Sequence, residues 1–89
     1  PEYCLGYVLA RASYAGHAKV VKILLEDNRI EDIGRVGGNA LLSACSNDQV
    51  AAIQELLKDS RIDPNYEEGR VLIMACENAQ IDILQVLLS

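Results

Sequence analysis

The sequence predicts an all-α fold in which short helix-turn-helix units stack side by side as a solenoid. Two observations support this prediction. The leucine pairs Leu24-Leu25, Leu56-Leu57 and Leu87-Leu88 recur at steps of 32 and then 31 residues. The segment ALLSAC at 40–45 returns as VLIMAC at 71–76, again 31 residues later. A fixed period of about 20–50 residues is typical of repeat proteins, in which each unit packs only on its neighbours.

Other positions recur at the same spacing and divide the chain into units. EDNRIED at 26–32 corresponds to KDSRIDP at 58–64. Each unit has a glycine, a leucine and an alanine at equivalent positions, and a small residue follows each alanine. The columns are Gly6, Gly38 and Gly69; Leu9, Leu41 and Leu72; Ala12, Ala44 and Ala75; and Ser13, Cys45 and Cys76. We therefore expect one domain over 1–89, with repeats at approximately 6–37, 38–68 and 69–89. Bulk after the alanines would push the helices apart, so cysteine serves there as a small apolar residue.

Each unit is expected to contain two helices. The first covers about 40–46 and about 71–77, two turns that cannot persist without packing. The second has apolar residues at Val50, Ile53, Leu56 and Leu57, the spacing of an amphipathic helix with one buried stripe. Val20, Val21, Leu24 and Leu25 have the same spacing in the first unit. Gly37-Gly38 and Asp63-Pro64-Asn65 are expected to form turns between units.

Composition restricts the class of partner and the compartment. With 51% hydrophobic and 24% charged residues the chain is too apolar for disorder. The net charge of −5 and scattered Lys and Arg argue against nucleic acid and favour a basic protein surface on encounter. No apolar run reaches about 18 residues, so no membrane span is expected. Three cysteines without CxxC indicate a reduced, intracellular and cytoplasmic chain. A start at Pro1 suggests a piece of a longer protein.

The candidate disulfide, catalytic, phosphate-binding and calcium-binding residues are better explained by roles in packing and turns. A Cys45–Cys76 disulfide is disfavoured because stacked helices lie about 8–10 Å apart, beyond the roughly 7 Å that a bridge spans. Cys45 with His17, the only histidine, lacks a third orienting group for nucleophilic catalysis. GRVGGN at 34–39 lacks the Lys-Ser/Thr of a phosphate loop, and Glu67-Glu68 lacks a calcium-loop register. We expect no catalysis, cofactor or metal site.

The units resemble the ankyrin repeat. LARASYAGHAKVVKILLED at 9–27 matches the family pattern L-x-x-A-A-x-x-G-H-x-x-V-V-K-x-L-L, and the later units match it more loosely, so the resemblance covers about residues 6–89. Paired-helix TPR units fit less well, because their Trp and Gly-Tyr landmarks are absent. Tyr7-Val8, Asn39-Ala40 and Arg70-Val71 replace the family's Thr-Pro. We therefore expect irregular hairpin turns between units.

Two local predictions follow from these departures. Asn39 can cap its helix, whereas Tyr7 and Arg70 cannot. The Gly-His turn survives only as Gly16-His17, so Asn47 and Asn78 are expected to take the left-handed backbone conformation in the later units.

The resemblance implies a protein–protein interaction module that binds a partner through its concave face. Because the LLxDxRIDP form looks like repeats of large DNA viruses, amoebae and intracellular bacteria, it implies part of a larger adaptor or a host-directed effector, secreted into a host cell. Carried over, the turn tips contribute Arg35, Asn39, Tyr66, Glu67, Glu68 and Arg70, and the first helices contribute Tyr14, Ala15, Ser46, Asn47, Glu77 and Asn78. Tyr14 and Tyr66 are the expected anchors, since Tyr is enriched at hot spots.

The alternative is a structural role. The last helix is rich in Ile, Leu and Val and lacks the polar outer face of a capping repeat. Either further repeats follow, or the ends of the array self-associate end to end.

Overall fold

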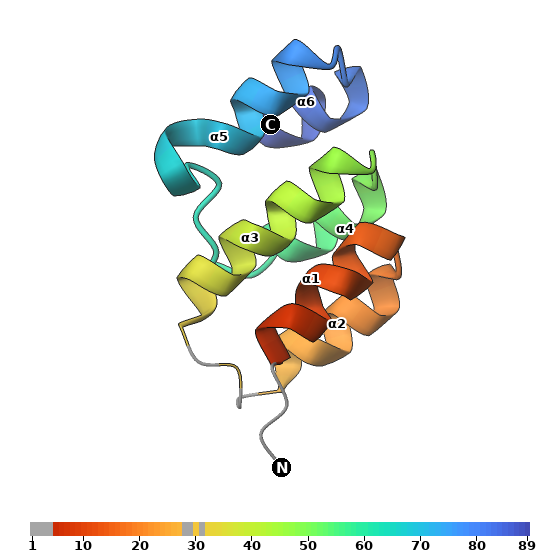
Figure 1. The fold of residues 1–89 in the computed structure, drawn as a ribbon, viewed down its shortest axis with the longest axis vertical. Coiled ribbons are helices and arrows are strands. Elements are labelled where there is room, and N and C mark those ends of the chain that lie inside the picture. Colours follow the sequence, from red (N-terminus) through yellow and green to blue (C-terminus); the bar gives the residue numbers. More distant parts are fainter. Residues whose placement is uncertain (1–4, 28–29, 31) are drawn as a thin grey trace.

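Within residues 5–27, 30 and 32–89, which the computed structural model describes, the chain forms helices and no strand (Figure 1). The helices are α1 (Leu5–Ala15), α2 (Ala18–Glu26), α3 (Ile33–Ser46), α4 (Val50–Leu57), α5 (Tyr66–Glu77) and α6 (Ile81–Leu88).

The helices form three pairs that stack along the longest axis of the molecule. The molecule measures 40 × 23 × 18 Å along its principal axes. Helices α1, α3 and α5 lie side by side in one layer, and α2, α4 and α6 form the second layer behind them (Figure 1). Each pair therefore packs only on the pair before and after it. This arrangement confirms the predicted all-α solenoid of helix-turn-helix units.

One hydrophobic core runs through all three pairs. Leu24, Leu56 and Leu87, the residues that revealed the period, all belong to it or pack against it. The alanine column is buried throughout, and both Ser13 and Cys45 are fully buried beside it. The Ser13 hydroxyl donates a hydrogen bond to the Leu9 carbonyl at 2.8 Å, which satisfies its polar group. The prediction that the small pair serves close helix packing is confirmed for these two repeats.

The same tight turn joins the two helices of each pair. The position of its left-handed residue corrects one prediction. The left-handed residue is Gly16 in the first turn (φ 78°), Asp48 in the second (φ 55°) and Ala79 in the third (φ 53°). Asn47 and Asn78, the expected left-handed residues, have φ −114° and −97°. The residue after each left-handed position donates its backbone N–H to the carbonyl of Ala12, Ala44 or Ala75, at 2.9–3.0 Å. This six-residue closure is a Schellman motif, which fixes where the left-handed residue must lie.

The first helices are longer than expected. Helix α3 begins at Ile33 rather than near 40, so Gly37 and Gly38 lie inside it and the prediction that they form a turn is wrong. Asn39 likewise lies within the helix and does not cap it. A Cβ on Gly37 would overlap the Ile62 side chain, and one on Gly38 would overlap the Tyr66 ring. The glycines are present because Ile62 of the following connection and Tyr66 at the start of α5 pack directly against α3.

Helix α5 includes a left-handed turn at its start. Its bounds begin at Tyr66, but Glu67, Glu68 and Gly69 have φ of 52°, 60° and 78°. The right-handed helix therefore begins at Arg70, close to the predicted start near 71. Non-glycine residues in this conformation cost about 1–2 kcal/mol each, so neighbouring contacts must hold the turn in place. Packing of Tyr66 on Gly38 is one such contact.

Candidate functional site

The outer side of the α1–α3–α5 layer carries the most contact-prone side chains. On α1, Tyr7, Arg11 and Tyr14 follow one another at spacings of four and three residues, so they share one face of the helix. The guanidinium of Arg11 lies over the Tyr7 ring, 6.0 Å from its centre. Tyr7 and Tyr14 are 62% and 46% exposed, so their rings face solvent rather than the core.

Helices α3 and α5 continue this surface with Asn39 and Arg70, equivalent to Tyr7, with Ser46 and Glu77, equivalent to Tyr14, and with Ile73, one turn after Arg70. Asn39 and Ser46 are exposed on α3, and Arg70, Ile73 and Glu77 are exposed on α5. We call the whole surface the first-helix face, made of Tyr7, Arg11, Tyr14, Ala15, Asn39, Ser46, Asn47, Arg70, Ile73, Glu77 and Asn78. Helix α3 contributes only short side chains, whereas α1 and α5 contribute long ones.

The expected turn-tip residues do not form one tip. Arg35 lies on α3, where it donates to a carboxylate oxygen of Asp32 at 2.8 Å, and Asn39 lies one turn later on the same helix. Tyr66 is half-buried by its packing on Gly38, and its role as an anchor stays a prediction. The remaining tip residues, Glu67, Glu68 and Arg70, are exposed on the left-handed turn of α5 and at its end. A guanidinium nitrogen of Arg70 lies 4.0 Å from a carboxylate oxygen of Glu67. Whether any of them contacts a partner stays a prediction.

The expected residues at the ends of the first helices are brought together by the stacking. Tyr14 and Ala15 end α1, Ser46 and Asn47 end α3, and Glu77 and Asn78 end α5, and all are exposed. The Asn47 side chain donates to the Tyr14 carbonyl at 2.9 Å, so it links the first two repeats. Their role in binding remains a prediction, although their position on one surface supports it.

Three members of the first-helix face were not predicted from the sequence: Tyr7, Arg11 and Ile73. Tyr7 was considered only as a residue that cannot cap a helix. Tyr7 could have been predicted from the repeat alignment, because it is equivalent to Asn39 and Arg70, which were both predicted to contact a partner. Arg11 and Ile73 follow at helical spacing from Tyr7 and Arg70, so they lie on the same faces.

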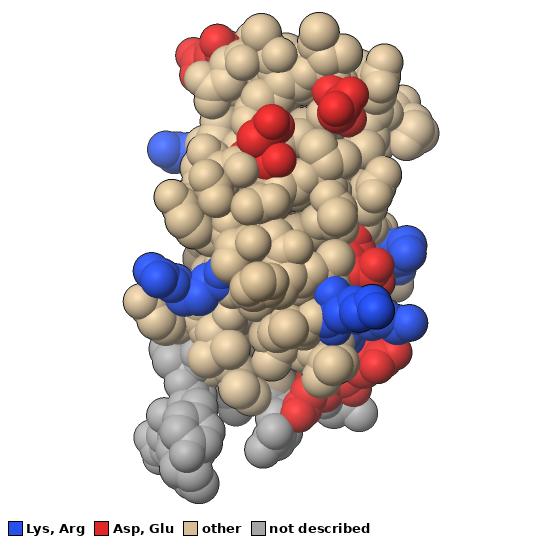
Figure 2. Space-filling model, turned by 90° about the vertical axis from the view of Figure 1, so that its right-hand side faces the viewer, with Lys and Arg blue, Asp and Glu red and all other residues tan. Residues whose placement is uncertain are grey.

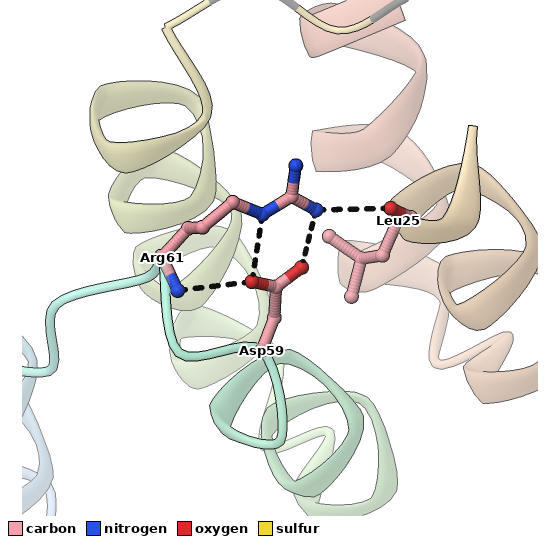
Figure 3. Close-up of polar contacts among 3 residues, drawn as sticks. All are labelled: Leu25, Asp59 and Arg61. Carbon is pink, nitrogen blue, oxygen red and sulfur yellow. Dashed lines mark hydrogen bonds and ion pairs between the residues drawn. The ribbon is translucent and has the colours of Figure 1, made fainter. Parts of the chain in front are cut away.

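An ion pair in the α4–α5 connection holds the repeats in register. The Arg61 guanidinium donates to both carboxylate oxygens of Asp59, at 2.9 and 2.6 Å, and also to the Leu25 carbonyl at 3.1 Å (Figure 3). Leu25 lies in the last turn of α2, whose carbonyls lack partners within the helix. The hydrogen bond from Arg61 lowers the pKa of the Asp59 carboxyl. The side chain of the next residue, Ile62, is buried against Gly37, so the connection also positions α3.

The surroundings of Cys45 disfavour thiol chemistry, and the described residues form no metal site. Burial raises the pKa of the Cys45 thiol, and the nearby Asp48 carboxylate raises it further, so the reactive thiolate is disfavoured. The thiol also donates to the Gln80 amide oxygen at 3.1 Å. In the part of the chain that is described, no three His, Cys, Asp or Glu side chains could together hold a metal ion. No helix there is long and apolar enough to span a membrane.

Two layers of paired helices that stack in one direction define a helical-repeat solenoid, a class that uses its extended surface for binding. The family model described as ankyrin repeats (3 copies) matches residues 8–89. The chain belongs to the ankyrin-repeat family. Ankyrin repeats are in general protein–protein interaction modules and are typically not enzymes. No curated protein and no solved structure matched the chain.

Proposed function

We propose that this chain binds a partner protein through the first-helix face, as the interaction module of a larger intracellular adaptor or of an effector delivered into a host cell. The observation that supports this most strongly is the exposed Tyr7–Arg11–Tyr14 row on α1. Tyr and Arg dominate binding hot spots because they combine large contact area with a polar group. Neither tyrosine ring is needed in the core, so packing does not account for them.

The rest of the face fits a polypeptide partner that crosses all three first helices. Short side chains on α3, namely Asn39 and Ser46, leave room between the tyrosines of α1 and the Ile73 and Glu77 side chains of α5. Ile73 is 53% exposed and can bury apolar area against the partner. A partner with an acidic group near Arg11 and a basic group near Glu77 would complement the charges on the face.

The proposal is tested by photo-crosslinking. A photoreactive amino acid placed at Tyr14 is expected to crosslink to the partner in lysate, and the same amino acid at Gln54, exposed on α4 in the opposite layer, is not. Mass spectrometry of the crosslinked product identifies the partner. Its affinity is then measured with purified proteins.

The matched variants separate the two layers. Replacing Tyr7 and Tyr14 together by Ala is expected to weaken binding by about 30-fold or more, as for a hot-spot residue worth about 2 kcal/mol. The control replaces Lys22, Gln54 and Gln85, exposed residues of the second layer, by Ala and should leave the affinity unchanged. If the control set abolishes binding while the tyrosine pair does not, the first-helix face is not the binding surface.

A further inference from the structure

Backbone strain is concentrated at the start of α5, drawn in teal in Figure 1. Glu67, Glu68 and Gly69 are consecutive left-handed residues, whereas the other non-glycine left-handed residues of the described chain occur singly, next to helix ends. On the side of the molecule shown in Figure 2, by contrast, acidic and basic side chains are interspersed, so charge singles out no site there. Two left-handed glutamates are unfavourable, so a specific contact must compensate for them.

The compensating contact involves a one-residue change of register. Val36 of α3 packs on Gly6 of α1, since a Cβ on Gly6 would lie 3.0 Å from a Val36 methyl carbon. Gly38 is equivalent to Gly6, and the residue equivalent to Val36 in the next repeat is Glu67. The residue that packs on Gly38 is nevertheless Tyr66. The left-handed turn therefore replaces a glutamate by the preceding aromatic residue at the contact with α3.

The same segment also has the residues of a right-handed helix start. Asp63 is equivalent to Asp32, which precedes α3, and Pro64 follows it. Asp is a preferred N-cap residue, and Pro is a preferred first residue of a helix. The Asp63 carboxylate already accepts the backbone N–H of Asn65 at 2.8 Å, the hydrogen bond that an N-cap makes to the second helical residue. With right-handed backbone at 67–69, α5 would begin at Pro64 and equal α3 in length.

Each of these two arrangements satisfies one requirement of the segment and violates another. The left-handed turn packs the Tyr66 ring on α3 and leaves both glutamates in solvent, but it strains their backbone. A right-handed start removes that strain, but it places the Glu67 side chain over Gly38 and releases the Tyr66 ring. The aliphatic part of Glu67 can cover the glycine there while its carboxylate remains at the edge in water. The two arrangements therefore oppose contributions of similar kind.

We propose that residues 66–69 form a conformational switch between these arrangements, which differ little in free energy. In the latched arrangement, which is the observed one, Tyr66 packs on α3. In the released arrangement α5 begins at Pro64, and Tyr66 takes the position of Arg35, its equivalent, which is exposed on α3. The released ring lies one helical turn before Arg70 and joins the first-helix face.

The switch controls what the first-helix face offers to a partner. A partner that contacts Tyr66 together with Arg70 binds only the released arrangement, so the latch lowers its apparent affinity and binding shifts the population. This consequence rests on the proposed function. The existence of the two arrangements does not, because it is a property of the chain alone.

Three variants should change the populations of the two arrangements. Glu67→Val supplies at Gly38 the residue type that α3 has at Gly6, and a β-branched residue disfavours left-handed backbone, so the released arrangement should dominate. Gly69→Ala should act in the same direction, because an added Cβ meets no atom within 4 Å and only the left-handed φ of 78° opposes it. Replacing Glu67 and Glu68 together by Gly relieves the strain and should fix the latched arrangement.

NMR spectroscopy of the free chain distinguishes the two arrangements. In the latched arrangement the Tyr66 ring protons give NOEs to the Hα protons of Gly38, and the amide–Hα couplings of residues 67 and 68 are those of positive φ. We expect both signals in the wild type, in the double-glycine variant and in the control Glu77→Val, which removes one charge at the far end of α5. Glu67→Val and Gly69→Ala should lose them.

Relaxation dispersion and saturation-transfer measurements then detect the minor arrangement of the wild type. We expect exchange at residues 66–69, with minor-state chemical shifts at Tyr66 and Glu68 that match those of Gly69→Ala, and no exchange in the double-glycine variant. Circular dichroism verifies that each variant is folded. The proposal is overturned by a wild type without exchange at these residues, by NOEs that persist in both released variants, or by their loss in the double-glycine variant.

The role in binding has its own measurement, with the partner that crosslinks at Tyr14. Gly69→Ala keeps both glutamates and should bind that partner more tightly than the wild type does, and adding Tyr66→Ala should abolish the gain. Equal affinities of Gly69→Ala and the wild type would refute this role. A failure of the proposed function is recognised separately, because replacing Tyr7 and Tyr14 by Ala tests it and leaves the NMR signals of residues 66–69 unchanged.

Discussion

The substitution Gly38→Ala should destabilise the chain, although the usual expectation is the reverse. Glycine inside a helix is about 0.8–1.0 kcal/mol less favourable than alanine, so replacing it normally stabilises. At Gly38 an added Cβ would overlap Cγ and Cδ2 of Tyr66 and would lie 2.7 Å from Cδ1. These atoms form the base of the ring, which can move away only by leaving its packed χ1 rotamer or by shifting the backbone at Tyr66.

The magnitude follows from two opposing contributions. Overpacking of this kind costs about 1–3 kcal/mol, and the gain in helix propensity offsets about 1 kcal/mol of it. The free energy of unfolding should therefore fall by up to about 2 kcal/mol, and each 1 kcal/mol lowers Tm by about 4–8 °C in a chain of this size. Gly34→Ala is the matched control in the same helix. Its Cβ would lie 3.7 Å from the nearest atom, the Arg61 carbonyl oxygen, so it should stabilise by up to about 1 kcal/mol.

Thermal unfolding followed by circular dichroism measures both variants, and a double mutant tests the cause. In a Tyr66→Ala background the ring is gone, so Gly38→Ala should become neutral or stabilising, a coupling expected of residues in contact. If Gly38→Ala raises the Tm of the wild type as Gly34→Ala does, Tyr66 does not pack on α3 and the left-handed turn at the start of α5 loses the contact that supports it.

Two further predictions concern the turns. Ala79→Gly should raise the free energy of unfolding, measured in urea, by about 0.5–1 kcal/mol, because glycine relieves the left-handed alanine. Ala51→Gly, inside α4, should lower it by about 1 kcal/mol. If both variants lowered the free energy of unfolding equally, the turn geometry would be contradicted. Asp59→Asn should destabilise near neutral pH because Arg61 lowers the pKa of Asp59 in the folded state. That difference from wild type should vanish as pH falls below the unfolded pKa of about 3.9 and through the lowered folded value; a pH-independent difference argues against the ion pair.

The sequence was sufficient to predict the stacked helix pairs because their packing repeats with the chain. Leu9 and Leu41 occupy equivalent, fully buried positions in successive repeats, so the same residue type recurs there and reveals the period. The turn residue could have been predicted from the same alignment. Asp48 and Ala79 are equivalent to Gly16, and the alignment is a better guide there than the general preference of Asn for left-handed backbone.

The early start of α3 could not be predicted in this way. Gly37 and Gly38 are typical of a turn when only their neighbours in sequence are considered. They are glycines because Ile62 and Tyr66, which lie far along the chain, require the space above the helix. The same limit applies to the candidate site. The period places Arg35 at a turn tip, whereas the lengthened helix places it on a helix surface, where it pairs with Asp32.

Helix termination and repeat stacking depend on the same residues, which has a consequence for binding. The backbone N–H of Gln49 closes the Schellman motif of α3, and its side chain holds the end of α1 at Tyr14. Fraying of that turn therefore loosens both the end of one helix and its contact with the preceding repeat. A partner bound over Tyr14 and Asn47 would cover this junction, so it would stabilise the stacking of the first two repeats as well as its own contacts.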